Sequence, residues 1–137
     1  MSGYSQTPLE KKLGFKPGMK VAIQGAPRGF LAGLDLPAKV KIDTHGQDHD
    51  MVIYFVNSFA QLKAKMRTLR RMIKQEGMIW ICWPKLGGKL LRDFNEDDIR
   101  RLAISFQLVD VKVISVNEAW SGLKLVVPTA LRTKGIA

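Results

Sequence analysis

A turn rich in glycine and proline follows the first apolar segment of the chain, and it is the stretch most able to hold a ligand. Residues 21–23 are apolar and lead directly into Gly25, Ala26, Pro27 and Gly29. Glycine adopts backbone angles closed to other residues, and the free N–H groups of such a turn can bind an anion or a nucleotide. The spacing departs from the nucleotide-binding pattern G-x-G-x-x-G, so a tight turn that only starts a helix is the alternative interpretation.

Two tryptophans at the ends of apolar segments form a second candidate site. Trp83 is followed by Lys85, and Trp120 is followed by Ser121. An indole ring stacks on planar groups, and a lysine ammonium binds a phosphate or a carboxylate. These residues therefore predict an aromatic and cationic pocket, with the alternative that both tryptophans close the end of the core.

Residues 58–76 form a predicted helix with one apolar stripe, and its remaining faces are basic. Four cations share one face at helical spacing: Lys63, Arg67, Arg70 and Lys74. Such a stripe can follow the phosphates of a nucleic acid and would make binding depend on salt. No aromatic residues alternate with these cations for base stacking, so a solvated outer face is the alternative.

Other chemistry has little support in the sequence. His45 and His49 are four residues apart, but Gly46 and the nearby acids favour a solvated loop, so we predict no metal site. No serine occupies a nucleophile elbow, and the paired acids Asp97 and Asp98 are explained by helix capping. We therefore name no catalytic residue and favour a protein that is not an enzyme.

Length and charge limit the remaining possibilities. The 137 residues fit one domain, and the net charge of +10 permits binding to nucleic acid, acidic lipid or an acidic protein. No apolar run is long enough to span a membrane, and no signal peptide is recognisable, so we expect a cytoplasmic protein. Cys82 lies in an apolar segment and is expected to be a buried, unreactive thiol. Any exposed sheet edge or helix could serve an oligomer.

The elements that position these residues alternate between strand and helix. Strands are predicted at residues 19–24, 40–43, 51–56, 78–83, 109–116 and 123–127, and helices at 7–13, 28–34, 58–76 and 95–106. This order predicts an α/β fold with a Rossmann-like, mostly parallel sheet, helices on both faces and a C-terminal antiparallel hairpin. The single domain, 1–137, divides into a lead-in over 1–18, a core over 19–127 and a tail over 128–137.

In such a sheet, ligands bind beyond the carboxyl ends of the strands. Those ends carry the glycine turn, Asp43, Asn57, the segment 83–85 and the loop 117–122. The leading function is therefore non-catalytic binding of a small ligand or nucleotide at this edge. Nucleic-acid binding through the basic helix is a third possibility, after the enzyme alternative given below.

The pattern of elements over residues 19–127 resembles the core of class I S-adenosylmethionine-dependent methyltransferases. The resemblance implies that the turn of Gly25, Ala26 and Gly29 holds the cofactor and that Asp43 binds its ribose. It implies a methyltransferase-like enzyme as an alternative function. The sequence departs from the family at Pro27 and in having only residues 44–50 where a helix usually follows the second strand.

Short phrases along the chain also resemble a family of small bacterial proteins of unknown function. They include Thr7-Pro8-Leu9, Lys16-Pro17-Gly18, Gly25-Ala26-Pro27, Trp83-Pro84-Lys85 and Trp120-Ser121-Gly122-Leu123-Lys124. This resemblance implies a cytoplasmic bacterial protein without an assigned activity.

Overall fold

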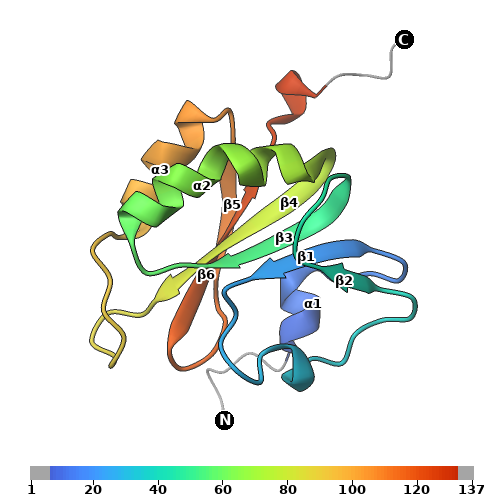
Figure 1. Cartoon of the computed structure of the whole chain (residues 1–137), viewed down its shortest axis with the longest axis horizontal. Helices are drawn as coiled ribbons and strands as arrows, with labels where there is room; N and C mark the ends of the chain where they lie inside the picture. Colours follow the sequence, from blue (N-terminus) through green and yellow to red (C-terminus); the bar gives the residue numbers. More distant parts are fainter. Residues whose placement is uncertain (1–6, 133–137) are drawn as a thin grey trace.

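Six strands form one mixed sheet in the computed structural model, which describes residues 7–132 (Figure 1). The strands are β1 (Lys20–Gln24), β2 (Lys41–Asp43), β3 (His49–Phe55), β4 (Ile73–Pro84), β5 (Val109–Ser115) and β6 (Trp120–Val126). Their spatial order is β2-β1-β3-β4-β6-β5. Strands β1 to β4 are parallel, and β6 runs antiparallel to both β4 and β5. The predicted α/β fold with its C-terminal antiparallel hairpin is confirmed.

Helices cover both faces of the sheet. Figure 1 shows α2 (Phe59–Met72) and α3 (Glu96–Ser105) together on one face and α1 (Leu9–Leu13) on the other. Two short 3-10 helices complete the described chain, η1 (Leu31–Gly33) and η2 (Thr129–Leu131). None of the helices in this part of the chain is long and apolar enough to cross a membrane.

Strand alternation divides the apolar side chains into two cores. In β4, Ile79, Ile81 and Trp83 pack on the α2–α3 face, while Trp80 and Cys82 pack on the α1 face. Both sets are almost wholly buried, as expected for parallel strands covered on two sides. Burial on both faces explains why the strand segments are nearly continuous apolar runs in the sequence.

The order of the strands reverses at β1. The chain leaves β1 for β2 on one side and then returns to form β3 on the other. A crevice for ligands is expected at such a reversal, beyond the carboxyl ends of the two strands that flank it. Here those strands are β1 and β3, so the reversal lies at the glycine turn.

The connection from β2 to β3, two parallel strands with β1 between them, is unusually short. Residues 44–48 make the crossing in place of a helix, although crossovers usually need a dozen residues or more. The short path is possible because β2 has only three residues and lies at the edge of the sheet.

Two predicted helix boundaries are wrong. The helix expected over 28–34 is only the 3-10 turn η1, because Pro27 precedes it and Gly29 adopts a positive φ of 84°. The helix expected over 58–76 ends at Met72, and β4 begins at the next residue. The helix ends there because the backbone of Ile73 pairs with His49 in β3, although the side chain of Ile73 continues the apolar stripe of the helix.

The predicted helix over 95–106 is confirmed as α3. Asn95 and Asp98 form a reciprocal capping box, in which each side chain accepts from the other residue's backbone N–H. Three acids in the first turn add a favourable interaction with the positive end of the helix dipole.

Candidate functional site

The turn after β1 is built around Gly25. This residue has a φ of +72°, and a Cβ at its position would lie 2.6 Å from the carbonyl oxygen of Phe55 at the end of β3. Gly29 also has a positive φ, +84°, but a Cβ there would meet nothing within 4 Å. Gly25 is therefore required both by its backbone angle and by the close passage of the turn across β3.

The turn leaves backbone donors available to a ligand. The N–H of Phe30 donates to the carbonyl oxygen of Pro27 at 3.1 Å, which closes the loop. The N–H groups of Ala26 and Arg28 have no hydrogen-bond partner among residues 7–132. Free N–H groups at a strand-to-helix turn are the donors expected to bind an anionic or polar ligand.

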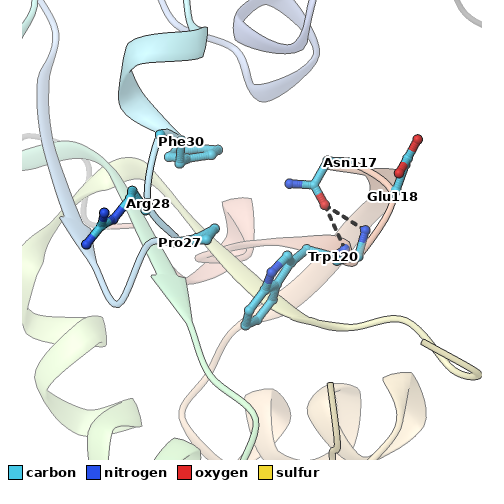
Figure 2. Close-up of a pocket in the computed structure, with 8 residues that line it drawn as sticks. Pro27, Arg28, Phe30, Asn117, Glu118 and Trp120 are labelled. Atoms are coloured by element: carbon cyan, nitrogen blue, oxygen red, sulfur yellow. Dashed lines mark hydrogen bonds between the residues drawn. The ribbon is translucent and has the colours of Figure 1, made fainter. Parts of the chain in front are cut away.

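A cavity of about 420 Å³ lies between this turn and the β5–β6 hairpin (Figure 2). Residues 27–30 and 117–120 line it. The ring of Phe55 packs edge-on against Phe30 and Trp120, with centroid distances of 4.9 and 5.0 Å. Phe55 and Phe30 are both almost fully buried, so the half-buried Trp120 supplies most of the accessible aromatic surface beside the cavity.

Asn117 adds a polar group to this cavity. Its Oδ1 accepts hydrogen bonds from the backbone N–H groups of Ala119 at 2.8 Å and Trp120 at 3.0 Å. These bonds fix the amide, and Figure 2 shows its nitrogen directed away from them, on the side of Phe30. The cavity therefore combines the aromatic ring of Trp120 with one oriented amide donor, and the exposed Arg28 and Glu118 also line it. This composition suits a polar planar heterocycle.

Asp43 lies at the carboxyl end of β2, as the sequence predicts, but it does not line this cavity. Its Oδ1 is 2.6 Å from Nε2 of His49, and 43% of its side chain remains exposed. His49 is fully buried, and its Nδ1 lies 3.1 Å from the carbonyl oxygen of Met72. The imidazole thus holds one carboxylate oxygen and leaves the other side of Asp43 open to solvent.

The expectation that His49 belongs to a solvated loop is therefore wrong. The residue begins β3, and its ring links the end of β2 to the end of α2. Within residues 7–132, no group of three His, Cys, Asp or Glu side chains is arranged to hold a metal ion.

The two tryptophans do not share a pocket. Trp83 and Trp120 belong to neighbouring strands, but Trp83 is buried in the core under α2 and α3, and Trp120 packs on the α1 face. Ser121 pairs with Trp83 in the β4–β6 register, and the Lys85 ammonium donates to Ser115 Oγ at 2.6 Å. Only Trp120 joins the turn at the cavity, because alternation along each strand sends Trp83 to the other face.

The basic stripe also differs from expectation. Lys74 lies in β4 and forms an ion pair with Asp50 at 2.9 Å, so it is not part of the helix. Arg70 donates to the carbonyl oxygen of Phe106 at 3.2 Å, and Arg67 lies over the Phe106 ring. Lys63 lies over the ring of Phe59. Much of the stripe is therefore engaged in contacts within the protein.

Phe30 and Phe55 contribute to the site although the sequence does not indicate them, and Asn117 is predicted only as part of the loop 117–122. An Asn in a short hairpin loop is a turn signal, because its side chain bonds the backbone two or three residues on. The contact between Phe30 and Trp120 through Phe55 joins three distant segments, and no local pattern indicates it.

Comparisons with known proteins identify the fold. No family model matches the chain, and no curated protein matches its sequence. A TehB-like SAM-dependent methyltransferase from Corynebacterium glutamicum superposes with a TM-score of 0.57 at 13% identity, over 91% of this chain and 90% of that one.

Two further solved structures give the same result. A ribosomal protein L11 methylase from Lactobacillus delbrueckii subsp. bulgaricus has a TM-score of 0.60 at 13% identity, over 85% of this chain and 73% of that one. A SAM-dependent methyltransferase from Aquifex aeolicus has a TM-score of 0.58 at 13% identity, over 85% and 86% of the two chains. The chain therefore has the fold of class I methyltransferases, as its element pattern predicts.

Proposed function

We propose that this protein binds S-adenosylmethionine, or a closely related adenosyl ligand, at the carboxyl edge of its sheet and acts as a methyltransferase. The observation that carries the proposal is the Gly25 turn, which lies where the strand order reverses and passes within contact of the Phe55 carbonyl. A ligand is expected at such a reversal, and a glycine with a positive φ allows the main chain to approach it closely.

The residues around the turn fit such a ligand. The N–H groups of Ala26 and Arg28 are available as donors, and Asp43 presents a carboxylate already oriented by a buried histidine. An oriented carboxylate suits the hydroxyl groups of a ribose. On the other side of the turn, Trp120 offers a half-buried aromatic ring beside the buried Phe30.

Asp43 and Trp120 mark two ends of the carboxyl edge of the sheet. Asp43 ends β2, and Trp120 begins β6, four strands away. Neighbouring strands are about 4.8 Å apart, so these positions are separated by roughly 19 Å across the sheet. The glycine turn lies between them, as expected if it supports the middle of an extended nucleoside.

Bound S-adenosylmethionine would supply an electrophilic methyl group. The contribution of the protein is then to bind and orient, which alone can supply a large part of a rate enhancement. The similarity of the whole sheet to methyltransferases favours this function over the non-catalytic binding that leads from the sequence alone.

Thermal unfolding with S-adenosylhomocysteine tests the proposal. A ligand at 100 times its dissociation constant adds about 2.7 kcal/mol, which raises the midpoint of a domain of this size by several degrees. Asp43→Asn removes the carboxylate charge but keeps an oxygen that can accept from His49, so this variant should fold and lose most of the shift.

Asp48→Asn is the matched control, because Asp48 lies in the same segment, is exposed, and has a positive φ of 62° that asparagine tolerates. Its shift should equal that of the wild type. Absence of any saturable shift in the wild type would contradict the proposed function. A full shift in Asp43→Asn would remove Asp43 from the site.

A further inference from the structure

Three lysines gather on the sheet face that α1 covers. Lys124 in β6 lies directly opposite Lys112 in β5 and next to Trp80 in β4. Trp80 belongs to the core under α1, so the lysine pair faces that side. Lys16, in the segment that follows α1, is close enough for its charge to act on Lys124. We refer to Lys16, Lys112 and Lys124 as the lysine cluster.

Nothing in the described chain neutralises the lysine cluster. None of its three members takes part in an ion pair within residues 7–132, whereas Arg100 alone pairs with three acids. Like charges directly opposite each other in a sheet are destabilising. Partial burial, together with the charges of Lys112 and Lys16, lowers the pKa of Lys124. This arrangement is unfavourable in the protein alone, and a bound anion would relieve it.

The lysine cluster lies on the same face of the sheet as the cavity. Trp120 and Lys124 are four residues apart on β6, which corresponds to about 13 Å along the strand. Trp120 packs on the core under α1, the face that Lys124 shares. Between them, the ammonium of Lys12 lies 3.5 Å from the carbonyl oxygen of Ser115. Positive charge therefore extends along the hairpin toward the cavity, where Arg28 and Glu118 both line the opening.

We propose that this surface binds a single-stranded nucleic acid, with its phosphates on the lysine cluster and its bases toward the cavity. Proteins that bind single strands combine a cationic track for the backbone with aromatic rings for the bases. A single phosphate would satisfy the lysines but would not use the aromatic cavity about 13 Å away. The net charge of +10 agrees with a polyanionic partner.

A role of this strand as the substrate of methyl transfer rests on the proposed function. Binding of the strand to the lysine cluster does not. The cationic surface on the hairpin differs from the basic helix considered in the sequence, which lies on the other face of the sheet. The two surfaces can therefore be separated by mutation.

Fluorescence anisotropy of an end-labelled single-stranded oligoribonucleotide tests the proposal over a range of salt concentrations. The test variant carries Lys112→Gln and Lys124→Gln. Each phosphate contact on a single strand contributes roughly 0.7 to the slope of log affinity against log salt concentration. The double variant should therefore bind more weakly, with a slope that is shallower by roughly 1.4.

The matched control carries Lys63→Gln and Lys65→Gln, which removes the same charge from α2. It should keep the wild-type slope, and a variant with Lys112→Arg and Lys124→Arg should keep binding. Both glutamine variants should remain folded, which circular dichroism checks. An equal loss of slope in the two glutamine variants, or no loss in the test variant, would overturn the proposal.

Two further measurements separate the possible outcomes. In the first, inorganic phosphate is added at a concentration equal to that of the phosphate groups of the strand. If it displaces the strand, the lysine cluster is a site for small anions and the strand proposal is overturned. Strand binding is measured without S-adenosylhomocysteine, and the binding of S-adenosylhomocysteine is measured without the strand. A failure of either proposal is thereby seen independently of the other.

Discussion

Replacing Gly25 by alanine tests the geometry on which the candidate site depends. The substitution places a side chain at a φ of +72°, where a non-glycine residue costs about 1–2 kcal/mol. The new Cβ would also lie 2.6 Å from the carbonyl oxygen of Phe55. Relieving such an overlap in a packed region costs typically about 1–3 kcal/mol. The free energy of unfolding should therefore fall by about 2–5 kcal/mol in all.

Gly29→Ala is the matched control for this experiment. Gly29 has a similar φ of +84°, but a Cβ there would have no neighbour within 4 Å. Only the backbone cost applies, so the loss should be about 1–2 kcal/mol. Urea denaturation followed by circular dichroism measures both values from the midpoints and slopes of the transitions.

The difference between the two variants is the quantity that matters. Gly25→Ala should be less stable than Gly29→Ala by about 1–3 kcal/mol, which is the overlap with Phe55 alone. Equal losses in the two variants would refute the close passage of the turn across β3. The Gly25 turn would then have no structural feature that marks it as a ligand site.

Three further predictions concern single residues. Burial raises the pKa of the Cys82 thiol, so a disulfide reagent should modify the unfolded protein and spare the native one at mildly alkaline pH. Burial of Asp50 is outweighed by hydrogen bonds from the Lys20 N–H and the Lys74 ammonium, which lower its pKa below 3.8. Asp50→Asn should therefore be less stable than wild type at neutral pH, and denaturation at several pH values should show the gap closing as the pH falls below 3.8. Lys124→Gln should stabilise the protein by about 0.2–1 kcal/mol, because it removes the like-charge pair with Lys112. Since the pKa of Lys124 is lowered in the folded protein, thermal scans should show this gain shrinking as the pH rises toward 10.5.

Strand and helix types could be predicted because the apolar patterns differ strongly between elements. The segment from Met51 to Phe55 is fully apolar and forms the buried centre of the sheet, and Asn95 and Asp98 mark the start of α3. The end of α2 could not be predicted, because Ile73 continues the helical stripe while its backbone pairs with β3. Sheet pairing joins residues that are far apart in the sequence, so the local periodicity does not predict it.

The candidate site was only partly accessible from the sequence. The turn at Gly25 and the position of Asp43 at the end of β2 were predicted from local signals. The burial of His49 depends on a five-residue crossing that brings β2 and α2 together around it. The separation of Trp83 from Trp120 depends on the register of β4 against β6. The burial of His49 and the separation of the two tryptophans both follow from tertiary arrangement. A one-residue slip in the register of β6 would turn the Trp120 side chain to the other face of the sheet.

Tryptophan fluorescence reports whether an adenosyl ligand binds beside the Gly25 turn. Trp80 and Trp83 are buried, whereas Trp120 lines the cavity, so a ligand there should change the emission of Trp120 alone. Titration with S-adenosylhomocysteine should give a saturable change in the wild type and none in Trp120→Phe. No change in the wild type, or an equal change in Trp120→Phe, would contradict binding of the ligand in this cavity.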